Sequence, residues 1–165
     1  MKNYWLSEYA TSMGTAAVAA TEHGVCQVWL PGDTLPTAPH TGSDLSLKAA
    51  GQLERYFQGT LQQFSLPVDL SELTTFRRYV LQLSMQIPYG TTMTYAGLAA
   101  MAGRPNAARA VGGAMAANPV PVIIPCHRVV ATSGALTGYS GAGGIAMKEF
   151  LLRLEGVDIS TLKNV

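Results

Sequence analysis

The stretch Thr94–Ala117, TYAGLAAMAGRPNAARAVGGAMAA, decides how this chain is organised. Thr94 is typical of a helix start and Gly103 of a helix end. We therefore expect one helix over residues 94–101 and a second over residues 107–117. Two short helices joined by about four residues that include glycine are typical of a helix-turn-helix. Many two-helix corners share this pattern, so it leaves both DNA binding and an ordinary helix pair open.

The segment that follows, Asn118–Val130, reads NPVPVIIPCHRVV. Its three prolines exclude a helix and the residues between them are apolar, so we expect a buried, extended segment. This segment carries Cys126 and His127 into the interior. Neighbours in an extended segment point to opposite faces, so these two side chains should not bond directly. Either a turn intervenes at this point or a water relays the proton.

Apolar residues at helical spacing predict three further helices, over residues 47–58, 76–87 and 146–155. The inward-facing residues expected on the last of these are Met147, Phe150, Leu151 and Leu154. Residues 15–21 and 25–30 are apolar or β-branched and are separated by a short polar turn, which indicates a β-hairpin.

The order of these elements predicts an α/β (α+β) fold. A small N-terminal strand-and-helix domain with its connector should span residues 1–71, and a mostly helical C-terminal domain with the helix-turn-helix should span residues 72–165. The first domain carries three basic and six acidic groups, and the second carries eight basic and four acidic groups. This excess of positive charge favours an anionic partner for the second domain, although a merely solvated face explains it equally well.

The amino-acid composition and the number of cysteines exclude several classes of protein. Of the 165 residues, 48% are apolar, which is enough for a hydrophobic core and excludes a disordered chain. No apolar run reaches the ~18 residues of a membrane span, and the N-terminus lacks a secretory signal. The two cysteines, Cys26 and Cys126, are too few for a disulfide framework and favour a reducing compartment. We therefore expect a soluble, cytoplasmic protein.

Cys126 is the residue that most suggests chemistry. Free cysteines are usually buried and structural, which is the alternative interpretation. Against it, His127 and Arg128 follow directly in a Pro-bounded segment, and a nearby cation lowers the pKa of a thiol. A metal site is not expected, because the two cysteines and three histidines do not supply four ligands at zinc spacing.

Several short motifs follow one another along the second half of the chain. They are Ile87-Pro88-Tyr89-Gly90, Thr94-Tyr95, Gly103-Arg104-Pro105, Ala107-Ala108-Arg109-Ala110-Val111-Gly112, Asn118-Pro119, Pro125-Cys126-His127-Arg128-Val129, Tyr139-Ser140-Gly141 and Lys148-Glu149. Together they resemble the O6-alkylguanine-DNA alkyltransferase family over residues 72–157. The ordered set is far more specific than any one motif, and the N-terminal half matches only in general layout.

The resemblance implies that the partner is double-stranded DNA containing O6-alkylguanine. Family members bind the minor groove through the helix-turn-helix and flip the damaged base out of the stack. Arg109 matches the residue that fills the gap left in the duplex. The other matched DNA-binding positions are Thr94, Ala107, Ala108 and Gly112. We expect a monomer that can cluster along DNA, with no membrane, metal or cofactor.

The resemblance also implies a stoichiometric reaction at Cys126, whose thiolate would take the alkyl group as a stable thioether. His127 matches the residue that takes the thiol proton through a water, and Glu155 matches the carboxylate that orients it. Tyr95 matches a residue whose hydroxyl hydrogen-bonds the guanine. Asn118 matches a residue that braces the turn between the second helix of the helix-turn-helix and the segment that carries Cys126.

Further matched positions belong to the substrate pocket. They are Tyr139 and Ser140 in a closing loop, Val129 through its carbonyl, and Met115, for which an ordinary core position is an equal alternative.

The chain departs from the family pattern at Ala116, where many members have arginine. It also departs in the glycine-rich loop, which is about two residues longer through Ala142-Gly143.

Two other functions stay open at this point. One is a non-enzymatic alkyltransferase-like lesion binder, although such proteins have tryptophan or another residue in place of Cys126. The other is a helix-turn-helix regulator of transcription, in which Cys126 and His127 would be ordinary core residues.

Overall fold

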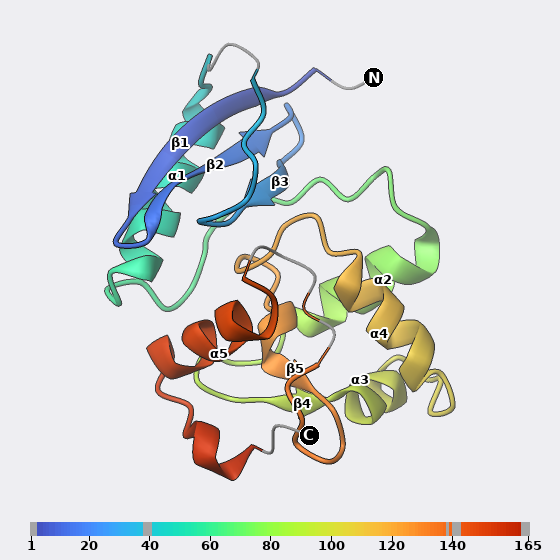
Figure 1. Ribbon diagram of the computed structural model, residues 1–165. Coiled ribbons are helices and arrows are strands. Elements are labelled where there is room, and N and C mark those ends of the chain that lie inside the picture. Colours follow the sequence, from blue (N-terminus) through green and yellow to red (C-terminus); the bar gives the residue numbers. More distant parts are fainter. Residues whose placement is uncertain (1–2, 38–40, 138, 140–142, 163–165) are drawn as a thin grey trace. The chain divides into compact units, whose positions relative to one another are not determined.

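The computed structural model of the chain describes residues 3–37, 41–137, 139 and 143–162 (Figure 1). The chain forms two compact units, Met1–Leu70 and Ser71–Val165. Strands and helices are both present, which confirms the predicted mixed class. None of the helices in the described ranges is long and apolar enough to cross a membrane.

The first unit is a three-stranded antiparallel sheet with one helix packed against it. Strands β1 (Trp5–Thr11), β2 (Gly14–Ala20) and β3 (Val25–Trp29) follow one another across the sheet. Helix α1 (Asp44–Phe57) contacts all three strands. The predicted hairpin is confirmed as β2 and β3.

Strand β1 is an element that the sequence pattern did not predict. Its sequence, WLSEYAT, mixes polar and apolar residues without strict alternation. Pairing with β2 places Leu6 opposite Ala19 and Tyr9 opposite Ala16, and all four side chains are buried. Burial that depends on a partner strand leaves only a weak signal in the strand itself.

Caps and turns shift two helix boundaries from the predicted positions. Helix α1 begins at Asp44 because Ser43 accepts a hydrogen bond from the Ser46 N–H while the Ser46 hydroxyl accepts one from the Ser43 N–H. Helix α2 (Thr75–Ser84) ends earlier than predicted, and Ile87 lies in the turn that follows it.

The second unit contains the predicted helix-turn-helix. Helices α3 (Tyr95–Met101) and α4 (Ala108–Ala116) pack on each other and on α2. Thr94 caps α3 by accepting a hydrogen bond from the Gly97 N–H at 2.9 Å. Gly103 has a φ of 75°, the left-handed conformation that commonly ends a helix.

A short parallel pairing ties the helix-turn-helix to the cysteine-containing segment. Strand β4 (Met93–Thr94), directly before α3, pairs with β5 (Val129–Val130). The residues before β5 form a single 3-10 turn, η1 (Cys126–Arg128). The predicted extended conformation is therefore wrong at these three residues, and the alternative of an intervening turn is correct.

Helix α5 (Gly144–Leu154) and the short η2 (Ile159–Thr161) complete the second unit. The helix predicted over residues 146–155 is confirmed, but its buried face is different. Met147 and Leu151 are buried as expected, Phe150 and Leu154 are half-buried, and Lys148 and Leu152 are buried although they were not predicted to be.

Candidate active site

Cys126 is the first residue of the η1 turn, with 6% of its surface exposed. Its N–H donates to the Ile124 carbonyl at 2.8 Å, and its own carbonyl accepts the Val129 N–H. All three residues of this turn, Cys126, His127 and Arg128, are buried.

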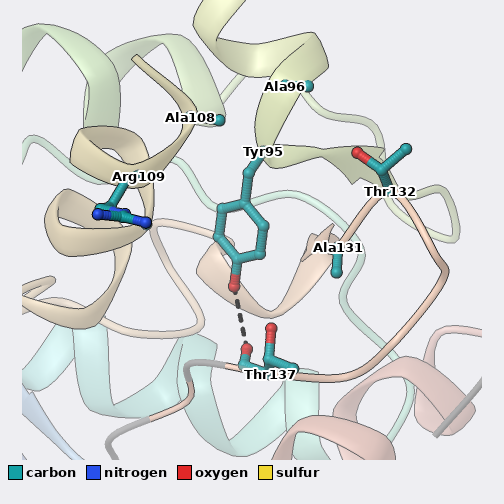
Figure 2. Close-up of a pocket in the computed structure, with 8 residues that line it drawn as sticks. Tyr95, Ala96, Ala108, Arg109, Ala131, Thr132 and Thr137 are labelled. Atoms are coloured by element: carbon teal, nitrogen blue, oxygen red, sulfur yellow. Dashed lines mark hydrogen bonds between the residues drawn. The ribbon is translucent and has the colours of Figure 1, made fainter. Parts of the chain in front are cut away.

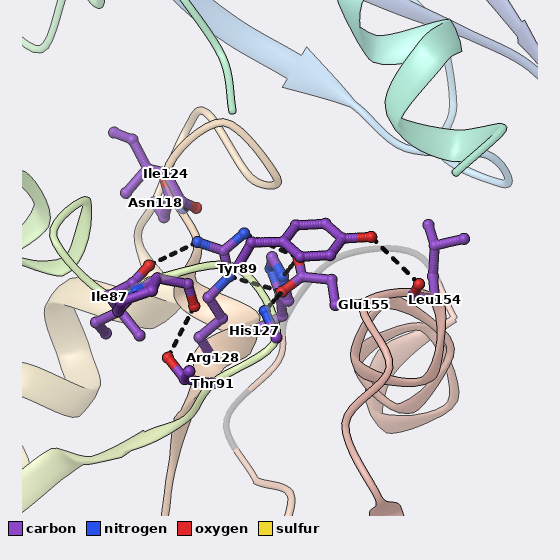
Figure 3. Close-up of polar contacts among 11 residues, drawn as sticks. Ile87, Tyr89, Thr91, Asn118, Ile124, His127, Arg128, Leu154 and Glu155 are labelled. Atoms are coloured by element: carbon purple, nitrogen blue, oxygen red, sulfur yellow. Dashed lines mark hydrogen bonds and ion pairs between the residues drawn. The ribbon is translucent and has the colours of Figure 1, made fainter. Parts of the chain in front are cut away.

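The next two side chains both meet Glu155, the residue that ends α5 (Figure 3). His127 Nε2 lies 2.7 Å from Glu155 Oε2. Arg128 donates from Nε to Oε1 at 2.8 Å and from Nη2 to Oε2 at 3.0 Å. The Gly90 N–H donates to Oε1 at 3.1 Å. The predicted pairing of His127 with Glu155 is thus present in the structure.

Burial keeps His127 in its neutral form. It lowers the pKa of the imidazole, and the charges of Arg128 and Lys148 lower it as well, while Glu155 acts in the opposite direction. A neutral imidazole that donates from Nε2 to a carboxylate presents an acceptor lone pair on Nδ1. His127 is therefore in the protonation state that a general base requires.

The Cys126 thiol is held in its protonated form by the same burial. Burial raises the pKa of the thiol above its ordinary value, and it outweighs a hydrogen bond from Asn118 and the charge of Lys148. The guanidinium of Arg128, two residues after the thiol, binds Glu155 and the Ile87 carbonyl. The thiol therefore needs a base before it can act as a nucleophile.

Asn118 braces the segment that leads to the cysteine. Its amide Nδ2 donates to the Ile124 carbonyl at 2.9 Å, and its Oδ1 accepts the Val120 N–H at 2.9 Å. Within this braced turn Val122 has a φ of 74°, a left-handed conformation that is rare for a β-branched residue. Asn118 thus links Val120 and Ile124 across a turn that contains a strained residue.

Lys148 is a buried residue of the site that the sequence analysis did not identify as functional. Its Nζ donates to the Val129 carbonyl at 2.6 Å and to the Thr137 carbonyl at 2.8 Å, and lies 3.5 Å from the Tyr95 hydroxyl. Burial lowers its pKa to about 8, against the effect of Cys126. A signal was present, because Lys148 and Glu155 are seven residues apart and fall on one helical face.

An open cleft of about 480 Å³ lies where α3, α4 and the segment after β5 meet (Figure 2). Its lining residues are Tyr95, Ala96, Ala108, Arg109, Gly112, Ala131, Thr132 and Thr137. The Tyr95 hydroxyl donates to the Thr137 carbonyl at 3.0 Å, and burial raises its pKa. The charge of Cys126 also contributes to the raised pKa of Tyr95, which links the cleft to the thiol electrostatically.

Small residues on α4 are not required by packing inside the protein. A methyl group added at Gly113 would meet no atom within 4 Å, and one added at Gly112 would only touch the Tyr95 ring at 3.9 Å. Ala110 and Ala116 are exposed. The exposed positions of α4 therefore carry little side-chain bulk.

The other predicted positions are spread over the same unit. Ala107 precedes α4 and Thr94 caps α3. Met115 is buried in the core and is not among the residues that line the cleft. Tyr139 is half-buried. Ser140 and the extra Ala142 lie outside the described residues.

Among the residues that the structure describes, no group of three or more histidine, cysteine, aspartate or glutamate side chains gathers as a metal site would require.

Comparison with known proteins gives a consistent set of relatives. The family model described as "6-O-methylguanine DNA methyltransferase, DNA binding domain" matches residues 75–157. The methylated-DNA--protein-cysteine methyltransferase of Methanosarcina barkeri is 50% identical over 108 residues, which span 66% of either chain. The constitutive protein of that name from Bacillus subtilis is 35% identical over 162 residues, 94% of this chain and 96% of the relative.

Solved structures match over both units. The crystal structure of the Mycobacterium tuberculosis O6-methylguanine methyltransferase has a TM-score of 0.79 at 35% identity and covers 93% of each chain. The Mycobacterium tuberculosis OGT in complex with DNA has the same TM-score at 37% identity and covers 91% of each chain.

Proposed function

The chain belongs to the 6-O-methylguanine DNA methyltransferase family, and we propose that it repairs DNA by transferring the alkyl group of O6-alkylguanine irreversibly to Cys126. One observation supports this acceptor above all: the residue directly after the buried Cys126 is a neutral His127 whose imidazole is held by Glu155 at 2.7 Å. A nucleophile, a base and a group that orients the base are the parts that covalent catalysis requires.

The reaction begins with activation of the thiol. His127 accepts the Cys126 proton, directly or through one intervening water. Because Glu155 occupies Nε2 at 2.7 Å, the accepting atom is Nδ1. The resulting imidazolium is stabilised by the Glu155 carboxylate. The Cys126 thiolate then attacks the alkyl carbon of the flipped base, and the S–C bond forms as the C–O6 bond breaks.

The leaving guanine departs with the electron pair of the broken bond and takes up a proton. Tyr95 is the donor in this proposal, because its hydroxyl faces the cleft and lies near Cys126. For this purpose Tyr95 exchanges its hydrogen bond to the Thr137 carbonyl for one to the base. The His127 imidazolium then releases the proton that it took from the thiol and Tyr95 is protonated again, so that the net transfer runs from the thiol to the guanine.

DNA docks on the helix-turn-helix, and the protein acts there as a monomer. The exposed small residues of α4 allow the helix to approach a groove closely. Arg109, exposed at the edge of the cleft, takes the place of the flipped nucleotide in the duplex. Base flipping is needed because the O6 position cannot reach a buried thiol while the base is stacked.

The test is the mass of the protein after incubation with duplex DNA that carries labelled O6-methylguanine. One methyl group should be found on each chain, and peptide mapping should place it on Cys126. Cys126→Ser should abolish the transfer but retain DNA binding, since a hydroxyl is a far weaker nucleophile. Methylation of Cys26 instead, or turnover of several lesions per chain, would refute the assignment.

A further inference from the structure

We propose that Arg128 is a positioning residue for His127: its ion pair neutralises Glu155, so that the imidazole stays uncharged and can accept the Cys126 proton. The inference rests on the proposed role of Cys126 as alkyl acceptor and adds a function for the residue two positions after it. Arg128 touches neither the substrate cleft nor the thiol in this assignment, and it acts only through Glu155.

The first support is the way in which Glu155 is surrounded. Its side chain is fully buried, and Arg128 reaches both carboxylate oxygens, at 2.8 and 3.0 Å. His127 approaches Oε2 and the Gly90 N–H approaches Oε1. The negative charge of the carboxylate therefore faces both a permanent cation, Arg128, and the imidazole of His127. Arg128 makes two hydrogen bonds to the carboxylate, whereas His127 makes one.

The second support is that Arg128 cannot turn away from the carboxylate. Its Nη1 donates to the Ile87 carbonyl at 2.7 Å, and its guanidinium lies 5.7 Å from the centre of the Tyr89 ring (Figure 3). Only 7% of the residue is exposed. A planar guanidinium presents its N–H groups as a fixed fork that matches the two carboxylate oxygens and leaves a further N–H for the carbonyl, a geometry that the three donors on a single ammonium nitrogen do not match.

The third support is the balance of charge around His127. A buried histidine that faced Glu155 alone would hold its proton tightly, and an imidazolium cannot accept another. The cations that oppose this are Arg128 from η1 and Lys148 from α5. Cys126 is neutral until it reacts, and Tyr89 faces Arg128 with an uncharged ring. Of the two cations only Arg128 contacts the carboxylate itself.

The direct test is the titration of His127 by NMR. The chain has three histidines, so a His23→Gln/His40→Gln background leaves His127 as the single imidazole signal. In that background Arg128→Met should raise the pKa of His127 by about 1 or more, and Arg128→Lys should have a smaller effect. Arg153→Met is the matched control, because Arg153 is exposed and pairs with Glu149 at the surface. It should leave the titration unchanged.

The rate of alkyl transfer provides the second readout. In Arg128→Met the acid limb of the pH–rate profile should move to higher pH by the same amount as the pKa of His127. The rate should fall at neutral pH and recover in mild alkali, which a loss of packing would not produce. An unchanged His127 titration would overturn the proposal. A faster reaction at neutral pH would also overturn it, because it would make a thiolate–imidazolium pair the reactive form.

A further variant keeps the proposal testable if Arg128→Met does not fold. Arg128→Met combined with Glu155→Gln removes both charges, and His127 should then stay neutral as in the unchanged chain. A raised pKa of His127 in this double variant would contradict the proposal. If Cys126 were not the acceptor, the methyl group would fail to appear on it while the histidine titration still reported the effect of Arg128. The two failures are therefore distinguishable.

Discussion

The Glu155 carboxylate is fully buried and accepts hydrogen bonds from three residues, whereas the cleft beside α4 is open and lined mainly by small side chains. In the first region the polar contacts fix one arrangement of His127 and Arg128. In the second region the Tyr95 hydroxyl donates to the Thr137 carbonyl.

The two regions therefore suit two different tasks: the buried ionic cluster suits proton transfer, and the open cleft suits the recognition of DNA. A proton transfer needs donor and acceptor held within a narrow range of distance, which a buried ionic cluster provides. A flipped base needs space and a surface that a groove can approach, which small residues provide. Substitutions in the ionic cluster should therefore reduce stability and reactivity together, while substitutions of exposed residues on α4 should mainly affect the encounter with DNA.

Removing the centre of the ionic cluster should have the largest effect. Glu155→Ala leaves Arg128 and His127 buried without their carboxylate, and the loss of one partner of a buried ion pair costs roughly 3–5 kcal/mol. Chemical denaturation should show a loss of that order. The matched control is Glu149→Ala, since Glu149 forms only a surface pair with Arg153, and it should cost less than ~1 kcal/mol. Equal losses for both variants would contradict the central place of Glu155.

Lys148 should make stability depend on pH in the alkaline range. Its pKa is about 8 in the folded chain, below the ordinary 10.5. The unfolded chain therefore binds the proton more tightly, and the free energy of unfolding should rise with pH between those two values, by up to roughly 3 kcal/mol. Denaturation of the unchanged chain and of Lys148→Met across this range measures the contribution. A difference that stays constant with pH would show that Lys148 is not held in a site that disfavours its charge.

Arg109 should matter for duplex DNA and not for the fold. Arg109→Ala should leave the free energy of unfolding within ~0.5 kcal/mol, because the side chain is exposed. Repair of O6-methylguanine in a duplex should slow by roughly tenfold or more, about 1.4 kcal/mol. The reaction with free O6-benzylguanine, which needs no flipping, should change much less. Arg153→Ala serves as a control outside the helix-turn-helix. Equal losses on both substrates would place Arg109 in the chemistry instead.

The smallest effect is expected at Gly113, in the interior of α4. Gly113→Ala meets no neighbouring atom and should stabilise the protein by ~0.4–1 kcal/mol, because alanine has the higher helix propensity. DNA binding should nevertheless weaken if the proposed docking is correct, since the new methyl group would then lie on the face that approaches the groove. Gly51→Ala in α1 is the matched control: it also meets no atom and should stabilise without any change in DNA binding. Unchanged DNA affinity in Gly113→Ala would argue against close approach at this position.

The sequence alone predicted the elements whose signals are local. Thr94 and Gly103 mark the ends of α3 because a cap and a left-handed glycine act within one helical turn. The prolines around Cys126 excluded a helix for the same kind of reason. The resemblance that the ordered motifs carry added the pairing of His127 with Glu155, which the structure contains.

Tertiary structure decided what depends on residues far apart in the chain. Strand β1 is buried through its pairing with β2 and its packing against α1, and Arg128 binds Glu155, 27 residues away. In the sequence Lys148 is one charged residue of a predicted helix. The fold places the Val129 and Thr137 carbonyls around its ammonium group. A charge is stable in the interior only where such partners meet, and which partners meet is fixed by packing between elements and not by the neighbours of a residue along the chain.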